Sequence, residues 1–62
     1  MIKHQQIARK VPPASRVLDV GCGPGDLGRS LNRKQCNVTG WDLKLDRINA
    51  NREFYQSLEE LD

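Results

Sequence analysis

Short apolar segments alternate with polar ones along the chain, and proline or glycine separates several of them. Residues 2–11 place Ile7 and Val11 one helical turn apart among Lys, Gln and Arg, which predicts a short amphipathic helix. Pro12 and Pro13 follow, and we expect them to end this helix because proline lacks an N–H and its ring disfavours helical continuation.

Residues 16–20 read RVLDV, a short and mostly apolar run with two valines. Such a run is typical of a strand buried on both faces within a parallel sheet. The next five residues include three glycines and a proline, so they predict a sharp loop rather than more strand. A second helix is predicted from about Asp26, a residue type favoured at helix N-termini, with Arg33 and Lys34 in its last turn.

A second strand is predicted over residues 37–41, ending at Asp42. A third helix is then predicted from near Asp46 to about Glu60. The order α-β-α-β-α indicates the α/β class, namely the opening segment of a Rossmann-like, doubly wound parallel sheet. Two strands leave uncovered sheet edges. We therefore interpret residues 1–62 as an N-terminal fragment of a larger domain; the alternative is a complete mini-domain whose edges are covered by a homo-oligomer or another partner.

Composition narrows the function classes. Of 62 residues, 37% are hydrophobic and 29% are charged, and the net charge is only +2. We expect no nucleic-acid partner because that charge is small, and no membrane partner because no apolar run approaches the roughly 20 residues of a bilayer span. The N-terminus lacks a secretory signal pattern, so a cytoplasmic location is expected. Cys22 and Cys36 lack the spacing of a metal site, and no metal is expected.

The glycine-rich loop allows two interpretations. Gly23, Gly25 and Gly28 fit the dinucleotide pattern G-x-G-x-x-G, with Asp42 nineteen residues after Gly23. Alternatively, Gly21, Gly23 and Gly25 form G-x-G-x-G, two residues after Asp19. In both cases a ligand would lie beyond the carboxyl ends of the strands, close to a backbone without Cβ atoms and near a helix N-terminus.

Asp19 favours the second interpretation. A carboxylate within a buried strand is costly to ionise unless it has partners. It would repel an anionic pyrophosphate but attract a ligand that carries an ammonium and a sulfonium group. Asp19 could also have the purely structural role of accepting hydrogen bonds from loop N–H groups, which is compatible with ligand binding.

Residues 17–25 resemble motif I of the class I S-adenosylmethionine-dependent methyltransferases, and Asp42 matches that family's acidic residue at the end of the second strand. The resemblance covers residues 16–43 and implies S-adenosyl-L-methionine as cofactor. It implies that Asp19 contacts the cofactor's amino group through water, that Asp42 binds the ribose hydroxyls and that Leu43 packs on the adenine. The implied cofactor-binding set is Asp19, Gly21, Cys22, Gly23, Gly25, Asp42 and Leu43, although packing is the favoured role of the Cys22 side chain.

The resemblance further implies methyl transfer to a small-molecule acceptor, with this chain carrying the cofactor-binding part. In the family, acceptor-side residues lie mainly beyond the helix after the second strand, and an adenine-contacting acid follows the third strand. We expect both to be absent here, unless Asp62 approaches that acid. The catalytic residues are therefore unknown, and we expect residues 1–62 alone to be inactive. The alternatives are an NAD-type Rossmann segment of an oxidoreductase and a truncated, non-catalytic protein.

Overall fold

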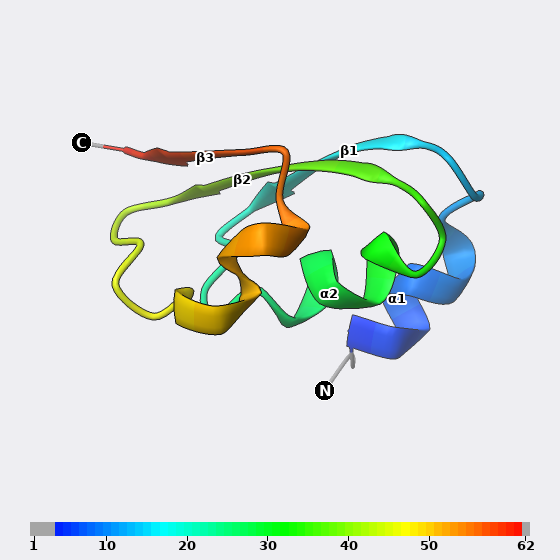
Figure 1. Cartoon of the computed structure of the whole chain (residues 1–62), viewed down its shortest axis with the longest axis horizontal. Coiled ribbons are helices and arrows are strands. Elements are labelled where there is room, and N and C mark those ends of the chain that lie inside the picture. The colour runs from blue at the N-terminus through cyan, green and yellow to red at the C-terminus, as the bar shows by residue number, and fades with distance from the viewer. Residues whose placement is uncertain (1–3, 62) are drawn as a thin grey trace.

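The computed structural model describes residues 4–61. In chain order it contains α1 (His4–Lys10), β1 (Arg16–Val20), α2 (Asp26–Asn32), β2 (Asn37–Asp42), the 3-10 helix η1 (Asn49–Phe54) and β3 (Ser57–Glu60). The three strands form one parallel sheet in the order β1-β2-β3 (Figure 1). This alternation of helices and parallel strands confirms the predicted α/β, Rossmann-like fold.

The strands predicted over residues 16–20 and 37–41 are both present, and the second includes Asp42 as its last residue. They pair in parallel from Arg16 opposite Asn37 to Val20 opposite Trp41. Their carboxyl ends therefore lie side by side at one edge of the sheet. This register places the loop after β1 next to Asp42, the last residue of β2.

The predicted third helix from Asp46 to Glu60 is wrong. The chain instead forms η1 and then a third strand, β3, in which Thr39 of β2 lies opposite Ser57 and Asp42 lies opposite Glu60. Glutamate is depleted in strands, so local propensity gave no indication of β3. Pairing with β2 outweighs that propensity because it satisfies the backbone groups of β2 along an edge that would otherwise be open.

The helices cover a single face of the sheet, and the expected burial of the first strand on both faces is also wrong (Figure 1). Residues along β1 alternate between exposed and half-buried, and Leu18 and Val20 are 50% and 66% exposed. Between the sheet and the helices lies a small core, and its buried members are Ala8, Cys22, Leu31, Cys36, Val38, Ile48 and Tyr55. The opposite face, defined here by Leu18, Val20 and Trp41, is called the open face below.

Lys34 ties α1 to the rest of the molecule. Its Nζ donates hydrogen bonds to the carbonyl oxygens of Ala8, at 2.8 Å, and of Val11. These carbonyls belong to the end of α1 and the residue after it, where helical carbonyls lack partners within the helix. Across residues 4–61, no helix has the length and apolar character needed to cross a membrane.

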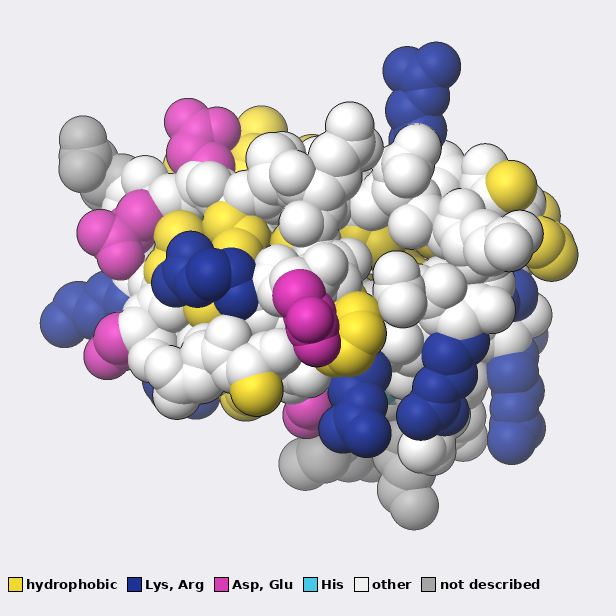
Figure 2. Space-filling view, in the orientation of Figure 1, with side chains coloured by type: hydrophobic (Ala, Val, Ile, Leu, Met, Phe, Trp, Pro, Cys, Tyr) yellow, Lys and Arg dark blue, Asp and Glu magenta, His cyan; other side chains and the backbone are white. Residues whose placement is uncertain are grey.

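The charges are distributed unevenly over the surface. On the face that Figure 2 shows, most Asp and Glu side chains lie toward the C-terminal half, whereas Lys and Arg side chains lie over both halves and include several around α1 and α2. This matches the sequence, in which residues 42–62 hold most of the acidic residues.

Candidate functional site

The loop between β1 and α2 follows the carboxyl end of β1 and requires glycine at three positions. Gly21, Gly23 and Gly25 have φ angles of 73°, 53° and 89°. An L-residue in that left-handed region costs roughly 1–2 kcal/mol, which glycine avoids. The backbone N–H groups of Gly21 and Cys22 both donate to the Trp41 carbonyl, at 2.6 and 3.1 Å, so the loop starts bound to the end of β2.

Asp42 fastens the middle of this loop. Its Oδ2 accepts a hydrogen bond from the Gly23 N–H at 2.7 Å, and its Oδ1 accepts one from the Leu43 N–H at 2.7 Å. The Gly23 N–H, with smaller contributions from the N–H groups of Lys44 and Leu43, holds the pKa of Asp42 below its usual value. Oδ1 also accepts a longer hydrogen bond of 3.4 Å from the Lys44 N–H. A carboxylate offers about four lone-pair sites, so Oδ2 keeps capacity for one hydroxyl donor, whereas both sites of Oδ1 already face backbone N–H groups.

Asp19 lies in a different environment from Asp42. Its Oδ2 accepts a hydrogen bond of 2.8 Å from the Tyr55 hydroxyl. Burial raises the pKa of Asp19 above its usual value, and the Tyr55 hydrogen bond only partly opposes that shift. The loop N–H groups donate to other acceptors: those of Gly21 and Cys22 to the Trp41 carbonyl, and that of Gly23 to Asp42. Asp19 therefore does not accept hydrogen bonds from the loop, which its purely structural role would require.

Tyr55 belongs to this site although no local sequence pattern indicated it. Its hydroxyl donates to Asp19 and accepts a hydrogen bond of 3.1 Å from the Gly28 N–H in the first turn of α2. A Cβ atom built on Gly28 or Gly40 would lie 2.3 Å or 2.9 Å from the Tyr55 ring. Gly28 and Gly40, which both lie outside residues 17–25, therefore leave the space that this one large side chain fills, and they were the only signal of it in the sequence.

The loop glycines face different surroundings. A Cβ on Gly21 would meet nothing within 4 Å, and one on Gly23 would meet only the Arg47 Nη2, at 3.4 Å. A Cβ on Gly25 would lie 2.9 Å from the Cβ of Asn51, whose Nδ2 donates to the Pro24 carbonyl at 2.9 Å. Gly21 thus leaves open space beside the loop, whereas Gly25 packs against the η1 segment.

The remaining predicted positions lie close to the loop or outside the described region. Leu43 directly follows Asp42 and is 68% exposed, so its apolar side chain is available to a ligand. Cys22 is buried in the core, and burial raises the pKa of its thiol. Asp62 lies outside the described residues. The structure thus brings Asp19, Asp42 and the glycine loop together, and their cofactor contacts stay predictions.

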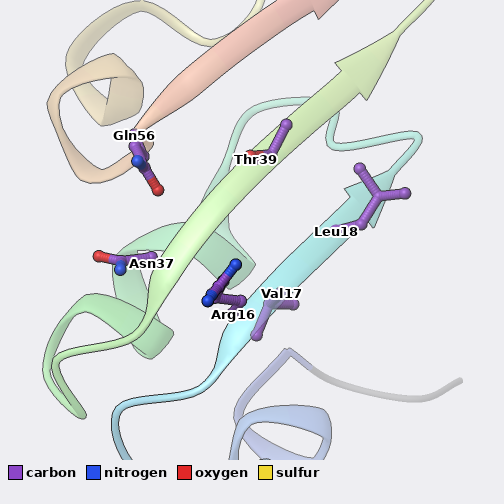
Figure 3. Close-up of a pocket in the computed structure, with 6 residues that line it drawn as sticks. All are labelled: Arg16, Val17, Leu18, Asn37, Thr39 and Gln56. Atoms are coloured by element: carbon purple, nitrogen blue, oxygen red, sulfur yellow. The ribbon is translucent and has the colours of Figure 1, made fainter.

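The hollow shown in Figure 3 lies elsewhere on the molecule. It is lined by Arg16, Val17, Leu18, Asn37, Thr39 and Gln56. Arg16 and Asn37 are the first residues of β1 and β2, so this hollow lies toward the amino ends of the strands. Ligands of open α/β sheets bind at the carboxyl ends, which makes the glycine loop the stronger candidate.

Comparison with known proteins identifies relatives. Residues 2–59 match the family described as methionine biosynthesis protein MetW. The chain is 40% identical over 47 residues to a ubiquinone biosynthesis O-methyltransferase of Psychrobacter arcticus, which covers 76% of the chain and 18% of the relative. It is also 40% identical over 52 residues to the protein of the same name from Xylella fastidiosa, which covers 82% of the chain and 21% of the relative.

The chain therefore spans about a fifth of the length of these curated relatives. No solved structure matches it. The family match and the names of the relatives confirm the resemblance to class I S-adenosylmethionine-dependent methyltransferases.

Proposed function

The chain belongs to the family of the methionine biosynthesis protein MetW, and from that premise we propose that its glycine loop, Asp19, Asp42 and Leu43 bind S-adenosyl-L-methionine for methyl transfer to a small-molecule acceptor. One observation carries this proposal. Asp19 and Asp42 lie near the carboxyl ends of two paired strands, on either side of a loop whose Gly21 leaves open space.

The two carboxylates suit the two polar ends of this cofactor. Asp19 has one oxygen bound to Tyr55, while its other oxygen has no hydrogen-bond partner among residues 4–61. That oxygen can attract a cationic amino group. Asp42 keeps a lone pair on Oδ2 for one ribose hydroxyl, and a second hydroxyl can replace the long, 3.4 Å hydrogen bond from the Lys44 N–H to Oδ1. Exposed Leu43 supplies an apolar surface for the adenine ring.

The cofactor, when bound, supplies a methyl group activated by its sulfonium leaving group. The work of the protein is to bind and orient the donor beside the acceptor and to exclude water. In this chain Asp42 orients the ribose end and Asp19 the amino end. We further propose that the methyl acceptor is a small molecule and that the protein has no nucleic-acid or membrane partner. The sheet edges would be covered by further chain or by another subunit.

The alternative of a dinucleotide fits the geometry less well. In G-x-G-x-x-G the second glycine allows the backbone to approach the pyrophosphate. Here that position is Gly25, and its Cβ direction is filled by Asn51, Ile48 and Tyr55 at 2.9–3.1 Å. The partly desolvated Asp19 would also repel a pyrophosphate.

Calorimetry with S-adenosylhomocysteine and with NAD on the full chain tests the proposal. S-adenosylhomocysteine lacks the sulfonium but keeps the amino group that Asp19 would attract. We expect the wild-type protein to bind it, and Asp42→Ala to weaken binding by about ten- to a hundredfold, the loss expected for a hydrogen bond to a charged group. Asp19→Asn keeps the side-chain shape, removes the charge and should also weaken binding.

Asp46→Asn is the matched control, because Asp46 is an exposed aspartate in the segment after β2. It should leave the affinity for S-adenosylhomocysteine unchanged. Tight binding of NAD without binding of S-adenosylhomocysteine would contradict the proposal, and an unchanged or improved NAD affinity in Asp19→Asn would support the dinucleotide alternative.

A further inference from the structure

Tyr55 connects three separate elements through one hydroxyl group. It follows η1, donates to Asp19 of β1 at 2.8 Å and accepts the N–H of Gly28 in α2 at 3.1 Å. The Gly28 N–H lies in the first turn of its helix, where backbone donors have no partner within the helix. The hydroxyl therefore satisfies one such donor and directs its own hydrogen toward the carboxylate.

The Tyr55 ring cannot move easily from this position. Its side chain is buried, with 7% of the residue exposed. Cβ atoms built on Gly25, Gly28 and Gly40 would each lie within 2.3–3.1 Å of the ring, so the ring occupies the space that these three glycines leave. The backbone on three sides fixes the ring, and the ring fixes the hydroxyl.

We propose that Tyr55 is a positioning residue of the cofactor site, which holds one oxygen of the Asp19 carboxylate so that the other is presented to the amino group of the ligand. This inference rests on the proposed function. The Tyr55 hydroxyl donates to Oδ2 of Asp19, and Oδ1 of Asp19 has no hydrogen-bond partner among the described residues. Tyr55 itself does not contact the reacting atoms and acts through Asp19.

The charges around Asp19 determine how the site responds to pH. Burial raises its pKa, the Tyr55 hydrogen bond and His4 of α1 lower it, and Asp42 of β2 raises it. Cys22 in the glycine loop also lies within electrostatic range of Asp19. Removing the Tyr55 hydroxyl removes a stabilising donor from the ionised carboxylate, so the pKa of Asp19 should rise further.

A double-mutant cycle on the full chain tests this role. Affinity for S-adenosylhomocysteine is measured by calorimetry for wild type, Tyr55→Phe, Asp19→Asn and the double variant. Tyr55→Phe keeps the ring and should weaken binding by about three- to tenfold, as expected for the loss of one ordinary hydrogen bond. In the Asp19→Asn background the same change should alter affinity by less than about twofold, because the group through which Tyr55 acts is gone.

The pH dependence gives a second readout. Binding should weaken as Asp19 is protonated, and the midpoint of that loss should lie at higher pH in Tyr55→Phe than in wild type. Phe54→Leu is the control, because Phe54 is the neighbouring aromatic residue and packs against the core without a hydrogen bond to Asp19. It should leave both affinity and midpoint unchanged.

The outcomes separate the two proposals. Failure of the wild-type chain to bind S-adenosylhomocysteine would overturn the proposed function. If the wild type binds and Asp19→Asn weakens binding, an equal effect of Tyr55→Phe in both backgrounds, or an unmoved pH midpoint, would overturn the positioning role alone. A loss of affinity in Phe54→Leu equal to that in Tyr55→Phe would likewise reduce Tyr55 to a packing role.

Discussion

At the scale of single residues, two aspartates at neighbouring strand ends have opposite electrostatic environments. The N–H of Gly23 stabilises the charge of Asp42, and the pKa of Asp42 is lowered. Partial burial opposes the charge of Asp19, and its pKa is raised despite the Tyr55 hydrogen bond. Folding therefore favours the ionised form of Asp42 but disfavours the ionised form of Asp19. The ionised Asp19 carboxylate thus lowers the free energy of unfolding.

This contrast predicts how stability depends on pH. The pKa of Asp19 is raised above the unfolded value of 3.8. Its contribution to stability is therefore fully present below 3.8 and is lost as the pH rises through the higher, folded value. Asp19→Asn cannot ionise, so we expect its free energy of unfolding at pH 7 to equal or exceed that of wild type. Urea unfolding of both proteins between pH 3 and pH 8 measures this difference in the free energy of unfolding.

For Asp42 the sign is reversed, because its folded pKa is lowered. Its contribution to stability is present above the unfolded pKa and is lost as the pH falls through the folded pKa.

Asp46→Asn, at an exposed aspartate, serves as the control for the unfolding of Asp19→Asn. A free energy of unfolding for Asp19→Asn at pH 7 well below that of Asp46→Asn would show that ionised Asp19 stabilises the fold, contrary to this expectation. Weaker ligand binding with equal or greater stability is a common pattern at functional sites.

At the scale of elements, sequence patterns predicted those parts that depend on local signals. The two strands and the start of α2 are bounded by proline, glycine and acidic residues, and all appear as expected. The segment from Asp46 to Glu60 has spaced apolar residues that fit a helix, but Leu58 lies in β3 and Tyr55 in an extended connection. Its structure depends on pairing with β2, and a local sequence pattern cannot indicate such a long-range contact.

The candidate site divides in the same way. Asp19, Gly21, Gly23 and Asp42 were found because their motif is local and its spacing is fixed. Tyr55 was missed because its contacts with Asp19 and Gly28 cross 36 and 27 positions in sequence. Gly40 of β2 and Gly28 of α2 indicate the position of Tyr55 only once the structure is known, because both face its ring.

The packing of α2 against Tyr55 predicts an unusual response to Gly28→Ala. Within a helix this change normally stabilises by about 0.8–1.0 kcal/mol. Here the new Cβ would lie 2.3 Å from two ring carbons of Tyr55, which is itself held by Asp19. Overpacking of this kind costs roughly 1–3 kcal/mol, so we expect a net decrease in the free energy of unfolding.

Urea unfolding of Gly28→Ala measures that decrease. Asn32→Ala, at an exposed position of the same helix, serves as control and should not lower stability. If Gly28→Ala proves more stable than wild type, the ring does not occupy the position described. Partial recovery in Gly28→Ala combined with Tyr55→Leu would identify the ring as the cause.

At the scale of the whole molecule, the sheet divides the surface into two unlike sides. One side carries α1, α2 and η1 over the core, and the other is the open face (Figure 1). Val20 and Trp41 lie opposite each other in the β1–β2 register, and Val20 is 66% exposed. Exposed apolar residues that are contiguous, rather than scattered, provide a surface on which apolar molecules bind.

Trp41 is the only tryptophan of the chain, so its fluorescence reports on the open face alone. The apolar dye 1-anilinonaphthalene-8-sulfonate should bind there and quench Trp41 fluorescence by energy transfer. Val20→Lys places a charge beside Trp41 and should sharply reduce both effects. Ile7→Lys is the control, since Ile7 is also exposed, at 38%, but lies on α1. If Ile7→Lys instead removes dye binding, the main apolar surface lies on α1, and the open face is less accessible than its exposed side chains indicate.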